Sequence, residues 1–205
     1  MMRVILTMKK EPKTIADEYT VDAACVQVFA KVVASISHEV KNVLAIINEN
    51  GGLLEDIILM SEPGQGVPPD YIRSAAAAIS SQVQRANRIM KNCNRLAHLG
   101  DRTIAEEPLA EILELMAALV QRQADMKHMT IAGEYQADIR IVAPMLPFAS
   151  LVYLLFRAII DAGQNDSTIT VSAASLENTI TLTFNVDLPA EILSQIVENG
   201  DIEAL

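Results

Sequence analysis

The sequence has no Trp, few Phe and Tyr, and only two Cys among its 205 residues. Cys25 and Cys93 belong to no CxxC or Cys/His cluster, so we expect free thiols and neither a disulfide framework nor a metal site. The net charge of −10 disfavours binding to nucleic acid or to an anionic membrane. Charged residues interrupt the apolar runs short of the roughly 18 residues that a membrane span needs, and the N-terminus lacks a signal-peptide layout. These features predict a cytoplasmic protein.

Apolar residues make up 51% of the chain. Most of them are Ala, Ile, Leu and Val, which favour long helices packed through aliphatic side chains. The first half is patterned as helices and the second half mixes helices with short strands, so the predicted fold class is α+β. We expect an N-terminal segment at residues 1–21, a helical hairpin at 22–102 and a small α+β domain at 103–205. The N-terminal segment fits an added strand or a loose tail equally well.

Residues 22–61 have apolar positions spaced mostly three and four apart, which predicts one heptad helix of about 40 residues. Asn50 is the polar interruption in this series, at a place where such a residue often fixes register. The predicted seam consists of Val26, Phe29, Val33, Ile36, Val40, Val43, Ile47, Leu54 and Ile57.

The segment SEPGQGVPP, residues 61–69, ends this helix because its glycines and prolines cannot continue it. A second heptad series ends near Gly100 and has its apolar positions at Ile72, Ala76, Ile79, Val83, Ala86, Met90, Cys93 and Ala97. The two helices are predicted to pair antiparallel, with Ile36 near Cys93, Val40 near Met90, Ile47 near Val83 and Leu54 near Ala76. Further apolar residues widen the face beyond a two-helix seam, so we expect a homodimer that forms a four-helix bundle.

The second half predicts helices at residues 108–127 and 147–162, strands at 139–142, 168–172 and 179–184, and a closing helix at 189–198. The last two strands alternate apolar and polar residues around a turn at 176–178 and should form a hairpin. Helices should cover one face of a small mixed sheet.

The stretch SHEVKNVLAII, residues 37–47, is the main candidate site. With Ile36 and Val40 in the seam, His38 points to solvent, and Asn42 lies one turn along the same face. Lys41 flanks this face, and Ala45 leaves room for another protein to approach the imidazole. Glu39 is adjacent and could orient the ring or take its proton. A solvated surface histidine is the plain alternative for a lone His on a helix.

This stretch closely resembles the H-box of histidine kinases, and the hairpin around it resembles their dimerisation and phosphotransfer hairpin. The resemblance implies that His38 is the phosphoryl acceptor and that Glu39 assists transfer. It also implies that Asn42 orients water or a receiver domain. Val43 departs from the family, which usually has Pro there.

The second half resembles a shortened ATP-binding domain of the same kinases, with important departures. Tyr153 and Arg157 stand where the family has asparagines, one of which holds Mg²⁺, and an arginine cannot ligate Mg²⁺. Asp187 matches the adenine-binding aspartate, but the glycines that should follow it are absent. The chain therefore resembles a histidine phosphotransferase built from a degenerate kinase core, which implies no cofactor and no ATP, with Mg²⁺ supplied by the partner receiver.

On this resemblance the partners are receiver domains of response regulators, with a hybrid histidine kinase as a further candidate. The predicted hairpin register places Lys91, Asn92 and Arg95 roughly level with His38. Of these, Asn92 and Arg95 are candidate partner-binding residues together with Lys41 and Ala45. Simple solvation of the basic side chains on the second helix explains them equally well. Two other functions stay open: a receiver phosphatase that uses Glu39 and Asn42, and a non-catalytic pseudokinase scaffold.

Overall fold

The computed structural model describes residues 2–7, 15–61, 66–136, 138–176 and 179–187, with side chains from residue 22 onward. Within these ranges the chain forms two compact units, one of residues 31–94 and one of residues 1–30 together with 95–205. The predicted boundaries at residues 22 and 103 differ from these. The described part contains both helices and a mixed sheet, so the fold class is α+β, as predicted.

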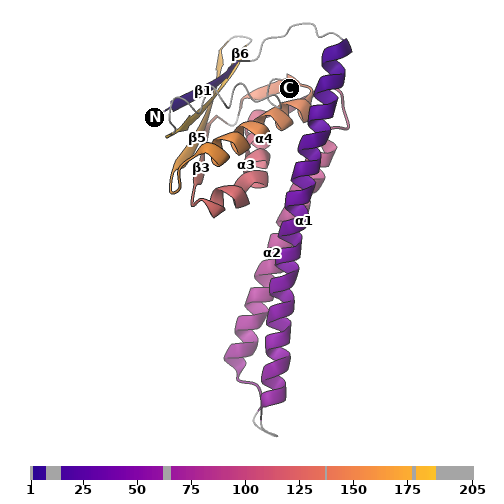
Figure 1. Ribbon diagram of the computed structural model, residues 1–205, viewed down its shortest axis with the longest axis vertical. Coiled ribbons are helices and arrows are strands. Elements are labelled where there is room, and N and C mark those ends of the chain that lie inside the picture. The colour runs from indigo at the N-terminus through magenta and orange to yellow at the C-terminus, as the bar shows by residue number, and fades with distance from the viewer. Residues whose placement is uncertain (1, 8–14, 62–65, 137, 177–178, 188–205) are drawn as a thin grey trace. The chain divides into compact units, whose positions relative to one another are not determined.

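Two long helices build the hairpin, α1 (Ile15–Met60) and α2 (Pro69–His98). Both were predicted, but α1 begins seven residues before the expected start at residue 22. Within the unit of residues 31–94 the two helices run in opposite directions (Figure 1). Asn50 is half-buried and its side-chain amide donates to the carbonyl of Ile46, 2.8 Å away, so this polar residue satisfies itself within its own helix.

The predicted seam of α1 is wrong in its N-terminal half. Val26 is 68% exposed, and Phe29 and Val33 are also exposed. The buried stripe instead consists of Cys25, Val28, Val32, Ile36 and Val43. The sequence carries two neighbouring apolar stripes with the same helical spacing, so spacing alone cannot tell which stripe is covered.

The predicted seam of α2 is displaced in the same way. Ile72, Val83 and Met90 are each close to half exposed, whereas Ala75 and Leu96 are buried. Ala76 and Ala97 are exposed as well. A rotation of one residue position, about 100° around the helix, separates the predicted from the observed stripe.

The second unit contains a four-stranded mixed sheet in the order β1-β6-β5-β3. Its strands are β1 (Met2–Thr7), β3 (Thr130–Tyr135), β5 (Thr168–Leu176) and β6 (Thr179–Val186). β3 pairs parallel with β5, and the other neighbours are antiparallel. β1 pairs along β6 from Met2 opposite Val186 to Thr7 opposite Thr181, so this part of the N-terminal segment is an added strand.

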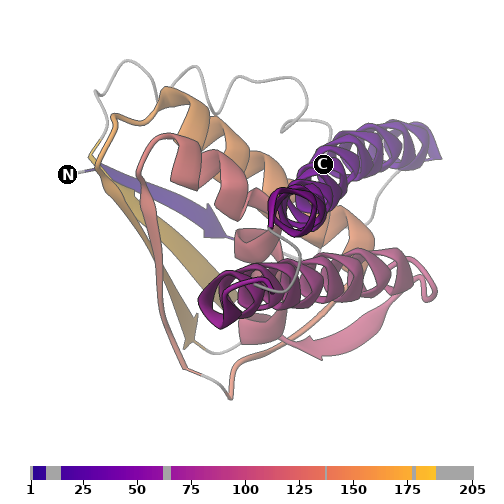
Figure 2. The same cartoon turned by 90° about the horizontal axis from the view of Figure 1, so that it is seen from below.

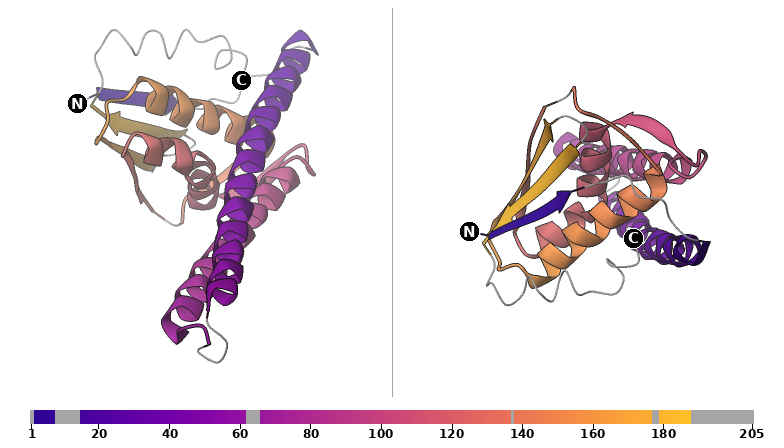
Figure 3. Two further views of the ribbon diagram at one scale, coloured as in Figure 1. Left: turned by 60° about the horizontal axis from the view of Figure 1, so that its bottom comes forward. Right: turned by 90° about the horizontal axis from the view of Figure 1, so that it is seen from above.

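Two helices, α3 (Leu109–Met126) and α4 (Met145–Ala162), cover one face of this sheet (Figure 2). Figure 3 shows α4 lying over β1, β5 and β6. The rings of Phe156 on α4 and Phe184 on β6 meet edge to face with centroids 5.3 Å apart. Both helices and the β5–β6 pair were predicted; the turn at 177–178 and the predicted helix at 189–198 lie outside the described residues.

A separate antiparallel pair joins β2 (Ala105–Pro108) to β4 (Arg140–Ala143). β4 was predicted within one residue at each end, whereas β2 and β3 were not predicted. Arg140 and Glu106 form an ion pair across this pair of strands, with 2.6 Å between Nε and Oε1. The helix α4 is long and apolar enough to cross a membrane by composition, but 61% of that stretch is buried inside the protein, as in a core helix.

Two leucines of the β5–β6 pair should contribute very differently to the free energy of unfolding, because only one of them lies in the core of the second unit. Leu182 is 1% exposed and Leu176 is 76% exposed. Leu182→Ala should lower the free energy of unfolding by about 2–5 kcal/mol because it leaves a cavity. Leu176→Ala should change it by less than about 0.5 kcal/mol. Urea denaturation of both variants measures this, and equal losses would contradict the described burial.

Candidate functional site

The face of α1 around His38 is open to solvent. The buried residues Ile36 and Val43 lie on the inner side of the helix. The exposed residues in this stretch include Ser37, His38, Lys41, Asn42 and Ala45. The predicted exposure of His38 and Asn42 therefore agrees with the structure, whereas the chemical roles of these residues stay predictions.

Helix geometry explains why these residues form one surface. Positions three, four and seven residues apart lie on the same face of an α-helix, so Lys41, Asn42 and Ala45 follow His38 along the helix. The imidazole is thus flanked by an ammonium group and an amide that can orient a polar partner. Ala45 adds no bulk that would obstruct approach to the ring.

Glu39 lies at the edge of this exposed face and is turned toward α2. Its side chain is 15% exposed, and its Oε2 lies 3.6 Å from Nη2 of Arg85. Arg85 itself is 40% exposed. The arginine therefore places a positive charge beside the carboxylate that the sequence assigned to assisting the histidine.

Arg85 is a site residue that the sequence analysis missed. The predicted register puts Arg85 level with Ala45, six residues or about 9 Å along α1 from Glu39. One signal in the sequence was available, since there is no Asp or Glu between Tyr71 and His98 although the whole chain is strongly acidic. The basic residues of that stretch are Arg73, Arg85, Arg88, Lys91 and Arg95.

The other two predicted partner-binding residues lie toward the C-terminal end of α2. Asn92 is half-buried. The guanidinium of Arg95 forms an ion pair with the carboxylate of Glu111 on α3. Arg95 is thereby tied to an acidic residue of its own unit, and its contact with a partner stays a prediction.

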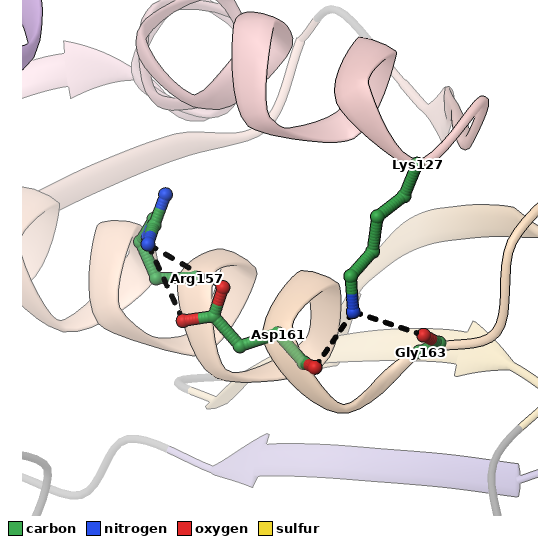
Figure 4. Close-up of polar contacts among 4 residues, drawn as sticks. All are labelled: Lys127, Arg157, Asp161 and Gly163. Atoms are coloured by element: carbon green, nitrogen blue, oxygen red, sulfur yellow. Dashed lines mark hydrogen bonds and ion pairs between the residues drawn. The ribbon is translucent and has the colours of Figure 1, made fainter.

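The positions that resemble a nucleotide site lie on α4. Tyr153 is 3% exposed, and burial raises the pKa of its hydroxyl, an effect that the charge of Arg157 partly offsets and that of Asp161 reinforces. The Arg157 guanidinium lies 3.3 Å from the Asp161 carboxylate, one turn along the helix (Figure 4). A buried phenol and an arginine already paired with a carboxylate do not fit a magnesium nucleotide, which needs free oxygen ligands.

The C-terminal end of α4 is closed by a lysine from the end of α3. The ammonium of Lys127 donates to the carbonyl of Asp161 at 2.7 Å and to that of Gly163 at 3.2 Å (Figure 4). These carbonyls include those that a helix end leaves without an internal partner, and a cation is favourable there. The lysine thus joins the ends of the two helices.

An open groove of about 580 Å³ lies where β3 and β5 end, lined by residues 133–136 and 173–175. Burial raises the pKa of the Tyr135 hydroxyl, and the negative charge of Glu114 adds to the shift. The groove therefore presents a neutral phenol. Among the described residues, no three His, Cys, Asp or Glu side chains lie together in a way that could hold a metal ion.

No protein-family model and no curated protein matches this chain. The chain is similar to a solved bacterial phosphotransferase, with a TM-score of 0.47 and 14% identity over 82% of this chain and 74% of that one. It is similar to the histidine kinase AdeS of Acinetobacter baumannii, with a TM-score of 0.40 and 11% identity over 82% of this chain and 87% of that one.

A third similar structure is the histidine kinase ThkA in complex with the response regulator protein TrrA. Its TM-score is 0.39 and its identity 14%, over 91% of this chain and 55% of that one.

The contact between Lys127 and the end of α4 leads to a prediction about stability. Lys127→Met keeps most of the apolar stem but removes the charge and both hydrogen bonds, so it should lower the free energy of unfolding by about 1 kcal/mol. Lys91→Met, at an exposed position on α2, is the matched control and should have little effect. Thermal unfolding of both variants compares them, and equal melting temperatures would show that the contact contributes nothing.

Proposed function

We propose that this protein relays phosphoryl groups between receiver domains through His38, without consuming ATP. The observation that carries the proposal is the exposed imidazole on α1, beside a carboxylate at Glu39 and one turn from the amide of Asn42. A packed core histidine would not present its ring nitrogens to another protein. The resemblance of residues 37–47 to the H-box of histidine kinases supports the same role.

The chemistry requires few groups from this chain. A neutral ring nitrogen of His38 attacks the phosphorus of an aspartyl phosphate in line, so that an N–P bond forms as the P–O bond to the aspartate breaks. The receiver's aspartate leaves as a carboxylate. The proton on the second ring nitrogen is then acidic, and the Glu39 carboxylate is the adjacent group that can accept it. The reverse sequence delivers the phosphoryl group to a second receiver.

Asn42 and Lys41 would assist by orientation and charge. The amide of Asn42 can hold a phosphoryl oxygen or a water, and the ammonium of Lys41 can offset negative charge that approaches the ring. Mg²⁺ held by the partner receiver would neutralise the same oxygens, so no metal is needed from this chain.

The proposal excludes ATP as the phosphoryl donor because of the side chains on α4. Tyr153 is part of the core and Arg157 is paired with Asp161, so neither supplies a metal ligand. We therefore propose that the phosphoryl group comes from another phosphorylated protein, with response-regulator receivers as donors and acceptors in the cytoplasm.

We also propose that the protein acts as a homodimer through the hairpin. Large apolar side chains in the unit of residues 31–94 remain exposed, among them Leu44, Leu53, Ile58, Leu59, Ile72, Val83 and Met90. Exposed apolar surface on this scale marks an interaction site. A second copy covers it most simply, because two hairpins can complete a four-helix bundle.

If the protein dimerises through this surface, a charged residue introduced there should separate the subunits. Leu53 is 51% exposed on α1. Leu53→Glu should shift the protein toward monomer, because a carboxylate buried between subunits loses its hydration. Light scattering after size exclusion gives the mass, with Leu176→Glu in the other unit as a control that should remain dimeric. A wild-type mass of one chain would contradict the proposed dimer.

The proposed relay predicts that an acid-labile phosphate label appears on this protein and that the label depends on His38. When phosphorylated receiver domains are added, phosphate should appear on the wild-type protein, and His38→Ala should abolish it. Glu39→Gln should slow labelling by about 10²-fold or more, since general acid–base assistance contributes roughly 10²–10⁴ in rate. His98→Ala, at an exposed histidine near the end of α2, is the matched control and should label normally.

Two outcomes of this experiment would replace the relay with another function. Receiver dephosphorylation that survives His38→Ala but is lost in Asn42→Ala would identify a phosphatase. Tight receiver binding without transfer or hydrolysis would leave a pseudokinase scaffold.

A further inference from the structure

The ion pair between Glu39 and Arg85 separates the carboxylate from the histidine beside it. Consecutive residues on an α-helix point about 100° apart, so the exposed His38 and the half-buried Glu39 face different directions. The Glu39 carboxylate lies 3.6 Å from the Arg85 guanidinium. An oxygen that faces a cation on α2 is poorly placed to accept a proton from an imidazole that faces solvent.

The contact is also weak enough to be exchanged. It joins a single nitrogen to a single oxygen at 3.6 Å, and the arginine is 40% exposed. Contacts of this kind contribute little, because water and salt compete with them. Arg85 has no acidic neighbour on α2 that would compete for it, since that helix has no Asp or Glu after Asp70. The guanidinium is therefore available to an acidic group that approaches from outside.

We propose that Arg85 is a positioning residue, which holds Glu39 away from His38 in the free protein and releases it when the acidic phosphorylation pocket of a receiver attracts the guanidinium. This inference rests on the proposed function, because it assigns the receiver as the group that triggers release. It accounts for the inward orientation of the carboxylate that the proposed proton acceptance needs. Arg88 and Lys91, on the same basic helix, add to the attraction.

A simple structural tie between α1 and α2 is the competing explanation. Such a tie would affect stability but would leave the histidine unchanged. The two explanations differ in the charge that can lie close to the imidazole, because a released carboxylate near the ring favours its protonated form.

The first test is an NMR titration of His38 in the full-length protein without any receiver. In Arg85→Gln the pKa of His38 should rise, because Glu39 is free to reach the ring. Removing a cation alone also raises this pKa, so Glu39→Gln is combined with Arg85→Gln. The rise caused by Arg85→Gln should be clearly smaller in the Glu39→Gln background than in the wild-type background, with Lys41 and Arg88 unchanged throughout.

Two results would overturn the inference. A rise of the same size in the wild-type and Glu39→Gln backgrounds would come from the lost cation and not from Glu39. A pKa that falls in Glu39→Gln alone would show that the carboxylate already acts on His38 in the free protein. Arg85→Lys should keep the wild-type titration, since a lysine can also pair with Glu39.

The second test measures transfer from a phosphorylated receiver at increasing receiver concentration. Arg85→Gln should raise the receiver concentration for half-maximal rate several-fold, while the rate at saturation stays within about twofold of wild type. A saturating rate as low as that of Glu39→Gln would mean that Arg85 is needed in the reacting complex, which overturns the inference. If no receiver labels the wild type, the proposed function and the trigger both fail, whereas the titration still decides whether Arg85 holds Glu39.

Discussion

Burial of one apolar stripe on α1 determines which side chains of the candidate site face solvent. Most of the stability of a helix in a protein comes from packing of its apolar face, so α1 depends on burial of a side-chain face. The buried stripe contains Val32, Ile36 and Val43. Since helical positions are fixed relative to one another, this choice turns His38 to solvent and Glu39 toward α2. The chemistry of the candidate site is thus a consequence of packing on the opposite side of the same helix.

The sequence predicted the positions of the helices better than it predicted which face of each helix is buried. The helices of both units were predicted from apolar spacing, which states only that one face is apolar. α1 has two such faces, and the choice between Val26 and Val28 as inward residues depends on tertiary packing that spacing does not contain. β2 and β3 escaped prediction because residues 105–108 are acidic and β3 includes Gly133. They are strands because β4 and β5 supply backbone partners, which outweighs weak local preference.

The candidate site also contains features that depend on one helix and features that depend on contacts between helices. Exposure of His38, Lys41, Asn42 and Ala45 followed from positions along a single helix, and the structure agrees with it. The pairing of Glu39 with Arg85 joins two helices, and long side chains can bridge positions that differ by more than a turn. No local pattern fixes such a contact, so the sequence could name Glu39 as a functional group but could not say what restrains it.

In the second unit, the helix that resembles a nucleotide-site helix is held by contacts within the chain. Tyr153 belongs to the core, Arg157 and Asp161 neutralise each other, and Lys127 binds the carbonyls at the end of α4. Arg157, Asp161 and Lys127 all have polar partners within the chain, so none of the three depends on a ligand for one. The proposed function therefore depends on the exposed face around His38 and not on these contacts of the second unit.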